Sequence, residues 1–507
     1  MAPPKRQPAD SRFKAWSAIR TASRGCLAVA SALSFVFCGC RQADSAAPLR
    51  GADVVLIVVD TLRADHLGFA GYALPTSPFL DRLAAESTVF TDALAPSSYT
   101  RESVAGLFTG MWPACSGAIG WNAAPEQVAT TLAEELAQAG YETVMLTLTT
   151  MLQAPPFARG FARVEHLAKQ WGVSRAGWQL TERALEIWRE PRNRPLFLYL
   201  HYLDPHGPYD PPPEMLARFP ERSEVVLDLY RDVRPKLPQL RAAGFDRSDP
   251  RLQEMVRRYD AEIAHTDQAL EQLFAGLRAS QRRPLLVVVT ADHGEEFLEH
   301  GFVEHAWTLY EESVRVPLLW WSPGRLPPQR SSAPASLVDI FPTIRALVGI
   351  APTPARGQVQ GAVLFALDRG RLRVAEMANR QRWAELGITE RNVVRALWWQ
   401  GWKYVVARRW LDPDQRSHSS KIEEQLRSTG NTPPLPPAGA EVREELFHLA
   451  SDPLEQRNSI SDAGEVLAGL RTHARDQEER CPLAGTRPKA PVTLAPHEAE
   501  ALRQLGY

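Results

Sequence analysis

Four short runs rich in apolar and β-branched residues recur along the chain, at residues 53–59, 141–148, 196–202 and 284–290. Runs of this length are typical of strands that are buried on both faces of a sheet. Residues 130–138, closed by Gly140, and about 250–278, with Tyr259, Ile263 and Leu270 at helical spacing, predict helices. Strands that alternate with helices predict an α/β fold with a mostly parallel, mixed sheet sandwiched by helices.

The pattern changes after about residue 370. Residues 396–406 have the pattern of a β-hairpin, and residues 444–449 that of one more strand. Residues 411–440 are polar and rich in proline, which predicts a loop. We therefore expect a main domain over residues 51–370 and a smaller C-terminal antiparallel sheet subdomain over residues 371–507.

The N-terminus has the pattern of an export signal. Basic residues within positions 1–24 precede an apolar run at 26–39, which is shorter than the roughly 20 residues that span a bilayer. Phe37-Cys38-Gly39-Cys40 resembles a bacterial lipobox, so residues 1–40 are expected to be a signal peptide and lipobox with lipidation at Cys40. Residues 41–50 would then be a tether, and the protein an exported, lipid-anchored protein of the cell envelope, in the periplasm or on the outer surface. Ordinary secretion and an uncleaved anchor are the alternatives.

Composition narrows the class of protein. The chain has 507 residues, of which 44% are hydrophobic and 23% charged, so it is neither disordered nor a polytopic membrane protein. Its 58 Lys and Arg balance 59 Asp and Glu, which leaves no overall field for nucleic acid, and no nucleic-acid partner is expected. Beyond the leader only Cys115 and Cys481 remain; the sequence leaves open whether they pair.

Acidic and imidazole side chains follow three of the predicted strands. Asp60 ends the first, His201 and His206 lie at the third, and Asp292-His293 ends the fourth. Because the carboxyl ends of parallel strands meet at one edge of a sheet, these side chains are expected to converge there. Mixed oxygen and nitrogen ligands suit Zn²⁺ or Mn²⁺ better than Ca²⁺ or Mg²⁺. The alternative is that the aspartates only cap helices.

Several longer phrases resemble the sulfatase family of the alkaline phosphatase superfamily. VVDTLRADHLG at 58–68 is similar to the family's first metal motif, TADHGEEF at 290–297 to its second, and HYLDPHGPY at 201–209 to its substrate-side segment. Further phrases resemble the family at 310–317, 336–342, 402–404, 445–458 and 505–507. The order and spacing fit from about residue 52 to the end, so residues 51–370 resemble a sulfatase N-terminal catalytic domain.

The resemblance implies a nucleophile at the start of a helix that ends in Thr-Gly. Counting back ten residues from Gly110 places Thr100 at the position that is Cys or Ser in the family, where it is oxidised to formylglycine. Threonine is not a precursor of formylglycine, so no formylglycine is expected. Glu102 and Val104 replace the Pro and Arg of the family motif, and Thr61 replaces a second metal-binding Asp. The alternative for Thr100 is a helix N-cap.

The resemblance and the residues together give a site. The expected metal ligands of a divalent ion are Asp60, Thr61, Thr100, Asp292 and His293. The expected catalytic residues are Thr100, His206 and His305. His201 is expected to support the site from the core. Glu295 and Glu296 are expected to support the site rather than to act as acid or base. Lys403 is expected either to contact a substrate anion or to be an exposed lysine of the hairpin.

Two classes of function follow. The first is an exported, metal-dependent hydrolase of a sulfate (or phosphate) ester. Because Thr100 would be a hydroxyl nucleophile, a phosphoesterase or phosphotransferase of the same superfamily is an alternative within this class. The second is a tethered scaffold that binds an anion or glycan without turnover. The expected partners are a small-molecule, glycan or lipid ester as substrate and a membrane through the lipid anchor.

Overall fold

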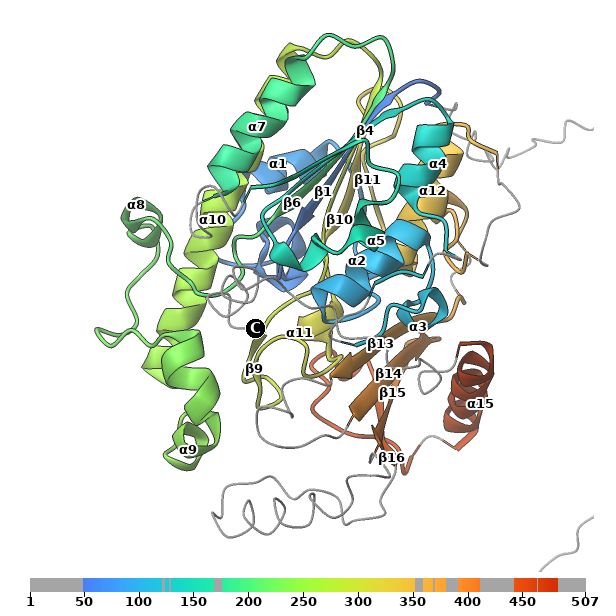
Figure 1. Cartoon of the computed structure of the whole chain (residues 1–507). Helices are drawn as coiled ribbons and strands as arrows, with labels where there is room; N and C mark the ends of the chain where they lie inside the picture. Colours follow the sequence, from blue (N-terminus) through green and yellow to red (C-terminus); the bar gives the residue numbers. More distant parts are fainter. Residues whose placement is uncertain are drawn as a thin grey trace, which may run out of the picture. The chain divides into compact units, whose positions relative to one another are not determined.

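The computed structural model describes residues 49–481, except 121–123, 127–128, 168–175, 352–358, 368–369, 380–390, 411–441 and 463. Its centre is an eight-stranded sheet with the order β11-β2-β10-β7-β1-β6-β4-β5 (Figure 1). The strands are β1 (Asp53–Val59), β2 (Thr88–Phe90), β4 (Glu142–Thr147), β5 (Arg163–His166), β6 (Leu196–Tyr202), β7 (Leu285–Ala291), β10 (Leu318–Trp321) and β11 (Gln329–Ser331). The predicted α/β class with a mostly parallel, mixed sheet is confirmed.

The middle of this sheet is formed by the three longest apolar runs. β1 pairs in parallel with β6 on one side and with β7 on the other, in the register Val59 opposite Tyr202 and Ala291. Every residue of these three strands is buried, as their continuous apolar sequence requires. The strand that breaks the parallel arrangement is β10, which is antiparallel to both β7 and β2.

Helices cover both faces of the sheet (Figure 1). One group consists of α1 (Pro78–Ala85), α7 (Gly177–Arg189) and α10 (Pro250–Ala279), and the other of α2 (Thr100–Thr109), α4 (Leu132–Gln138) and α12 (Ile340–Leu347). Thr131 and Glu134 form a capping box at the start of α4. Shorter helices are α3 (Pro113–Ser116), α5 (Pro155–Ala158), α8 (Pro213–Leu216), α9 (Leu237–Ala242) and α11 (Glu311–Val314).

Two further pairs of short strands lie beside the main sheet. β3 (Ala93–Leu94) pairs with β12 (Ala335–Ser336), and β8 (Glu296–Phe297) forms a hairpin with β9 (Val303–Glu304). This β8–β9 hairpin begins with the last two residues of the second metal-like motif. It therefore extends from the carboxyl end of β7, where the site is expected.

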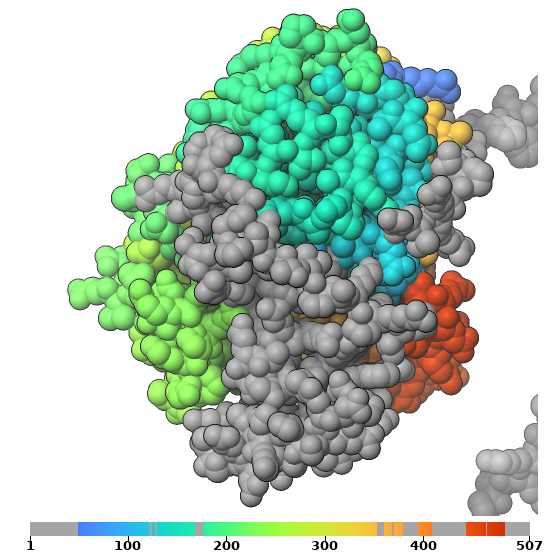
Figure 2. Space-filling view, in the orientation of Figure 1, coloured from blue at the N-terminus to red at the C-terminus, as the bar shows by residue number. Residues whose placement is uncertain are grey.

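The C-terminal part has its own four-stranded antiparallel sheet, in the order β13-β14-β15-β16. Its strands are β13 (Arg373–Asn379), β14 (Arg391–Trp399), β15 (Trp402–Trp410) and β16 (Val442–His448), and α15 (Gly464–Arg480) packs on it through Leu467 and Leu470. The predicted hairpin and final strand are present. Cys115 and Cys481 form a disulfide. In Figure 2 the surface of α15 (red) adjoins the surface of the main domain (cyan).

The C-terminal sheet is hydrogen-bonded to the segment around α2. Glu376 in β13 donates its backbone N–H to Pro96 O, and its carboxylate accepts from Ala114 N at 2.9 Å. The buried carboxyl of Glu102 accepts from Ser97 Oγ at 2.6 Å and from Ala378 N at 3.2 Å. Burial raises the pKa of Glu102 to about 8. β13 therefore fixes the polypeptide on both sides of α2.

Several predictions fall on residues outside the described ranges. The leader with Cys40, most of the tether and the proline-rich loop at 411–440 are among them. Residues 46–507 form one compact unit, and the domain boundary near residue 370 stays a prediction. Among the described helices, none has both the length and the apolar character that crossing a bilayer would take.

Candidate active site

The carboxyl ends of β1, β6 and β7 bring the predicted site residues together. Asp60 directly follows β1, His201 lies at the end of β6, and Asp292 and His293 follow β7. These three strands are neighbours in parallel register, so their ends meet at one edge of the sheet. All four side chains are buried.

Asp60, Asp292 and His293 form one cluster, whose ligand atoms lie within 4.8 Å of one another. His293 Nε2 lies 3.7 Å from Asp60 Oδ1 and 3.5 Å from Asp292 Oδ2. We call these three residues the catalytic cluster. Two carboxylates and an imidazole in this spacing are a donor set for a divalent cation.

The tautomer of His293 fits a metal ligand. Its Nδ1 lies 2.9 Å from Gly294 O, and because a carbonyl oxygen only accepts, Nδ1 carries the proton. Nε2 therefore presents its lone pair toward the two carboxylates. The lone pair of Nε2 and those of the carboxylate oxygens repel one another unless a cation lies between them. Metal-binding histidines commonly donate their other ring N–H to a carbonyl oxygen, as His293 Nδ1 does here.

The oxygens of the cluster lack partners within the described part of the chain. Asp60 Oδ1, Asp292 Oδ2 and the Thr61 hydroxyl are buried without a hydrogen bond there. Burial raises the pKa of Asp60 and of Asp292, and the negative charge of Asp60 raises that of Asp292 further. Orphaned buried oxygens are costly, so this set of donors fits a bound divalent ion.

Thr61 is placed by its backbone. Its φ of 54° lies in the left-handed region, which is uncommon for a β-branched residue. Its N–H points to Asp292 Oδ1 at 3.4 Å, and its carbonyl accepts from Tyr259 OH at 2.7 Å. The strained turn thus joins the end of β1 to the end of β7.

Thr100 is the first residue of α2 and is fully buried. The N-cap position belongs to Tyr99, and no side chain caps this helix, so the alternative of Thr100 as an N-cap is not what the structure shows. The Thr100 hydroxyl instead lies 3.1 Å from His293 Nε2. One turn later, Ser103 Oγ donates to Asp292 O at 2.6 Å, which fixes α2 against the end of β7.

His201 supports Asp60 from within β6. Its Nε2 lies 3.4 Å from Asp60 Oδ2, and its Nδ1 lies 2.8 Å from Tyr199 OH. Burial lowers the pKa of His201 to about 4 and raises that of Tyr199 well above its usual value. Both groups are therefore uncharged at neutral pH, and a Tyr199 O–H that donates to Nδ1 leaves Nε2–H for Asp60.

His206 and His305 lie beside the catalytic cluster. The His305 ring is centred 4.5 Å from that of His293 and 5.0 Å from that of His206. His206 Nδ1 donates to Gly207 O at 2.6 Å, so its Nε2 is the nitrogen that exchanges a proton. Glu295 holds His305 Nδ1 at 2.9 Å and accepts from Tyr209 OH at 2.9 Å, in line with its expected supporting role.

The segment that carries His305 has an unusual backbone. Leu298, Glu304 and Ala306 have φ values of 64°, 74° and 62° although none is glycine. Ala306 N donates to Ser98 O at 3.0 Å, which ties this segment to the residues before α2. Strain of this kind persists where the surrounding structure enforces it, often at functional sites.

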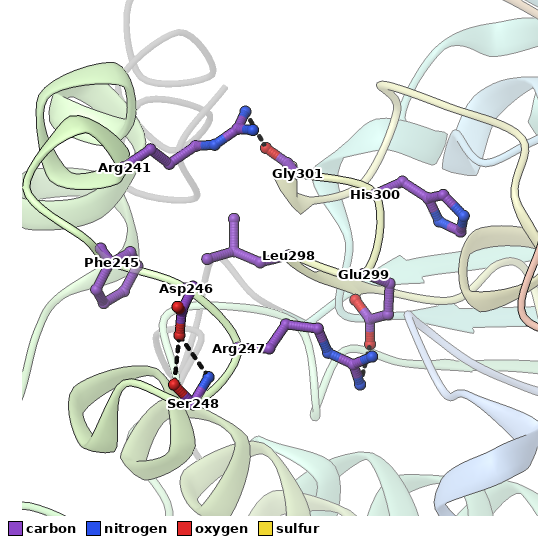
Figure 3. A pocket seen from close by; sticks show the side chains of 9 residues that line it. All are labelled: Arg241, Phe245, Asp246, Arg247, Ser248, Leu298, Glu299, His300 and Gly301. Atoms are coloured by element: carbon purple, nitrogen blue, oxygen red, sulfur yellow. Dashed lines mark hydrogen bonds and ion pairs between the residues drawn. The ribbon is translucent and has the colours of Figure 1, made fainter. Parts of the chain in front are cut away.

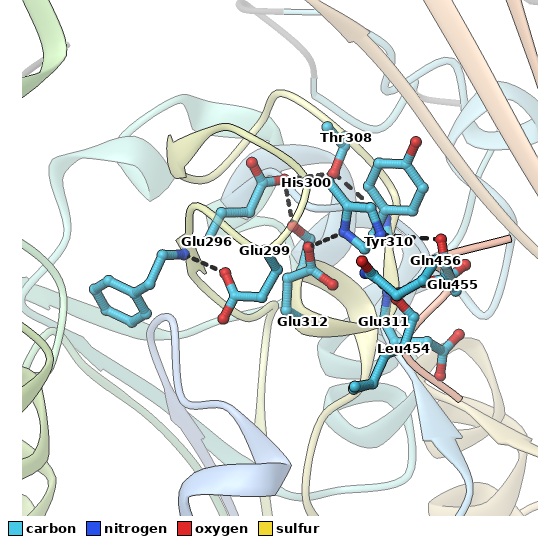
Figure 4. A network of polar contacts seen from close by, with 12 residues as sticks. Glu296, Glu299, His300, Thr308, Tyr310, Glu311, Glu312, Leu454, Glu455 and Gln456 are labelled. Carbon is cyan, nitrogen blue, oxygen red and sulfur yellow. Dashed lines mark hydrogen bonds and ion pairs between the residues drawn. The ribbon is translucent and has the colours of Figure 1, made fainter. Parts of the chain in front are cut away.

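Lys403 and His300 lie away from the catalytic cluster. Lys403 is completely buried, so the expectation of an exposed hairpin lysine is wrong; it pairs with Glu455 Oε1 at 2.6 Å. His300 Nδ1 lies 2.6 Å from Glu312, and its Nε2 donates to Glu455 O at 3.2 Å (Figure 4). Both side chains are committed to contacts between the main domain and the C-terminal part.

Sequence reasoning did not identify four supporting groups: Ser103, Tyr199, Tyr209 and Tyr259. Ser103 carried a weak signal, because a residue three positions after Thr100 lies on the same helix face. Tyr199 comes from β6, Tyr209 from a loop and Tyr259 from α10. No local sequence pattern shows that these three segments lie beside one another at the site.

Comparison with known proteins agrees with this geometry. The family model for Sulfatase matches residues 52–350. The uncharacterized sulfatase YidJ of Escherichia coli is 24% identical over 345 residues, which are 60% of this chain and 69% of that protein. The choline-sulfatase of Rhizobium meliloti is 29% identical over 305 residues, which are 56% of this chain and 50% of that protein.

Solved structures share the fold at low sequence identity. The phosphonate monoester hydrolase of Agrobacterium radiobacter has a TM-score of 0.65 at 18% identity and covers 85% of this chain and 96% of its own. A protein solved in complex with its substrate D-glucosamine-2-N,6-O-disulfate has a TM-score of 0.66 at 18% identity, covering 87% of this chain and 100% of its own. The chain therefore belongs to the sulfatase family of the alkaline phosphatase superfamily and is an enzyme of the sulfuric ester hydrolase type.

Proposed function

We propose that the protein hydrolyses a sulfate ester in a reaction that depends on a divalent cation and uses Thr100 as the nucleophile. The observation that carries this proposal is the place of the Thr100 hydroxyl, 3.1 Å from His293 Nε2 and beside the orphaned carboxylate oxygens of Asp60 and Asp292.

Asp60, Asp292 and His293, with the hydroxyl of Thr100, are the residues that would hold the cation. Because one donor is an imidazole nitrogen, Zn²⁺ and Mn²⁺ fit better than Ca²⁺ or Mg²⁺. The cation would neutralise the charge of the ester oxygens and lower the pKa of the Thr100 hydroxyl.

The chain supplies the remaining chemistry. Thr100 begins a helix of ten residues, whose dipole favours an anionic ester at this end. In the reaction, Thr100 Oγ forms a bond to sulfur as the ester S–O bond breaks, and the proton of the Thr100 hydroxyl passes through an imidazole to the leaving oxygen. His206 suits this transfer because its Nδ1–H is held by Gly207 O and its Nε2 can accept and release a proton. Water then cleaves the sulfo-threonine and restores the hydroxyl.

A phosphate ester or diester is the second candidate, and Thr100 itself favours it. A sulfate bound to threonine lacks the elimination route that an aldehyde hydrate provides, whereas a phospho-threonine is released by direct attack of water. The same intermediate could also be passed to an acceptor alcohol, which would make the protein a phosphotransferase.

Export to the cell envelope is part of the proposal. The disulfide between Cys115 and Cys481 supports it, because disulfides persist in oxidising compartments and are rare in the cytosol. Lipidation at Cys40 is tested by growing cells with an alkyne-labelled fatty acid. The label should appear on the wild-type chain and be absent from Cys40→Ala; equal labelling of both would contradict the anchor.

Turnover of three model esters tests the proposed reaction. An aryl sulfate, an aryl phosphate and an aryl phosphodiester are compared with added Zn²⁺ or Mn²⁺, with a chelator, and in the variants Thr100→Ala and Thr100→Ser. We expect chelator-sensitive sulfate hydrolysis that is lost in Thr100→Ala and partly kept in Thr100→Ser. Turnover of phosphate esters alone would favour the second candidate. No turnover of any ester and no bound metal would leave the non-catalytic scaffold.

A further inference from the structure

A cavity of about 560 Å³ lies between α9 with the segment after it and the turn of the β8–β9 hairpin (Figure 3). The residues that matter for its chemistry are Arg241, Arg247, Leu298, Glu299 and Gly301. Figure 3 shows Arg241 and Arg247 on either side of Leu298, so that the two guanidinium groups flank an apolar floor. None of these residues belongs to the catalytic cluster.

The acidic groups of the cavity wall already have hydrogen-bond partners in the chain. Asp246 accepts from the N–H and hydroxyl of Ser248 at 2.8 and 2.6 Å. Glu299 accepts from Arg63 Nη1 at 2.7 Å and from Phe297 N at 2.5 Å. Arg63 is thus the nearer cation for Glu299, and Asp246 keeps its negative charge, so the cavity has two arginines against one carboxylate that is bound by neutral donors.

The two arginines keep donors available. A guanidinium has five N–H groups, and among the described residues Arg241 donates to Gly301 O at 3.1 Å. The side chain of Arg247 is 58% exposed, and its Nη2 forms an ion pair with Glu299 Oε1 at 3.8 Å, a distance too long for a hydrogen bond, so its N–H donors are not used by this contact. Two cations with unused donors around an apolar floor suit a planar or tetrahedral anion that is attached to an organic ring.

The cavity is joined to the active site by the hairpin that forms it. Gly301 lines the cavity and His305 lies four residues further on, a distance of at most about 14 Å along the chain. Between them, Phe302 is 37% exposed and its ring stacks on Trp307 at 6.1 Å. Aromatic rings exposed in this way offer flat apolar faces for a sugar ring.

We infer that this cavity binds a second anionic substituent, sulfate or carboxylate, of a saccharide whose scissile ester is held at Thr100. The substrate would then be a multiply charged glycan rather than an isolated ester. This inference rests on the proposed function for the position of the scissile ester. Binding to the cavity itself is measured without turnover.

Calorimetric binding to the full chain carrying Thr100→Ala tests the inference apart from catalysis. The probes are a sulfated disaccharide that contains a uronate and a sulfated disaccharide whose second sugar is neutral. We expect Arg247→Ala to weaken binding of the uronate disaccharide about 10-fold, the range of one charge-assisted hydrogen bond, and to leave the neutral one unchanged. Arg231→Ala is the matched control, because Arg231 is 77% exposed and lies outside the cavity.

A second pair of variants separates charge from packing. Arg241→Lys should keep most of the affinity for the uronate disaccharide, and Arg241→Ala should lose it. Equal weakening of both disaccharides in Arg247→Ala, no weakening in either arginine variant, or no binding of the uronate disaccharide to the Thr100→Ala parent would overturn the inference. No ester turnover by the wild-type chain, with disaccharide binding intact, would instead count against the proposed reaction, so the two failures are distinguishable.

Discussion

Two groups of buried charges in this protein resemble each other in burial and differ in what compensates them. The catalytic cluster of Asp60, Asp292 and His293 leaves carboxylate oxygens without hydrogen bonds in the described part of the chain. The second group, which we call the joint cluster, consists of Lys403, Glu311 and Glu455. It lies where the C-terminal sheet meets the main domain.

In the joint cluster the chain provides its own cation. Lys403 Nζ lies 2.6 Å from Glu455 Oε1 and 3.4 Å from Glu311 Oε1, and Trp398 Nε1 donates to Glu311 at 2.8 Å. Burial would raise the pKa of Glu311, but the charges of Arg315 and Lys403 outweigh it and lower that pKa to about 2. The comparison shows that equal burial has two outcomes: a cluster with an internal cation holds parts of the fold together, and one without it is a place for an external ion.

The largest effect is expected for Thr100→Ala. It removes the hydroxyl that faces the catalytic cluster, and turnover should fall at least about a thousand-fold, as for other nucleophiles. Stability should change little, because Thr100 makes no cap, and most of the metal should remain, because Asp60, Asp292 and His293 are kept. The measurement is kcat with the best of the three model esters, beside metal content and thermal unfolding. Wild-type turnover in this variant would remove Thr100 as nucleophile.

Lys403→Met should have the opposite profile. It leaves Glu311 and Glu455 buried without their cation, which costs about 3–5 kcal/mol of unfolding free energy. Turnover per folded molecule should stay close to that of the wild type, since the ion-pair partners of Lys403 are Glu311 and Glu455, which do not belong to the catalytic cluster. Denaturant unfolding and kcat are measured on the same preparation. A stable Lys403→Met protein with impaired turnover would mean that the joint cluster belongs to the site.

Removing the disulfide should have a smaller effect. The bond closes a loop with a sequence separation of 366 residues, and loss of a disulfide typically costs about 2–4 kcal/mol. The double variant Cys115→Ser/Cys481→Ser should therefore unfold at lower denaturant concentration and keep its kcat. Wild-type chain treated with a reductant is the control and should match it. Unchanged unfolding of both would show that α15 needs no covalent link.

The smallest effect is a pH dependence of stability. Burial, only partly offset by Lys403, raises the pKa of Glu455 from 4.5 to about 7. The folded chain thus keeps this proton where the unfolded chain has lost it, so stability falls as pH rises from about 4.5 to about 7, by at most about 1.4 kcal/mol per pH unit. Glu455→Gln should flatten this fall, measured by unfolding at several pH values. Parallel curves for both proteins would contradict the raised pKa.

The elements that place the catalytic cluster could be predicted from the sequence. β1, β6 and β7 are continuous apolar runs, and their ends were located to within a residue or two, because a strand buried on both faces has no other pattern. The helix that starts at Thr100 and ends before Gly110 was located through the resemblance to the sulfatase family, and Gly110 adopts the left-handed φ of 65° that ends it.

The features that could not be predicted from the sequence depend on contacts between segments that are distant along the chain. The burial of Lys403 requires two carboxylates from other parts of the chain, and no local pattern reveals them. The positive φ of Leu298 and Ala306 is imposed by packing on residues that do not favour it, so the strained segment around His305 has no sequence signal. The pairing of Cys115 with Cys481 likewise follows from how α15 docks.

Metal content decides whether the catalytic cluster differs from the joint cluster in the way described. Wild-type, Asp292→Asn and Glu455→Gln proteins are equilibrated with Zn²⁺ or Mn²⁺, dialysed and analysed by elemental mass spectrometry. We predict one tightly bound ion per chain in the wild type and in Glu455→Gln, and an affinity at least about 100-fold weaker in Asp292→Asn. Equal occupancy in all three, or no ion in the wild type, would contradict a cation site at the ends of β1 and β7.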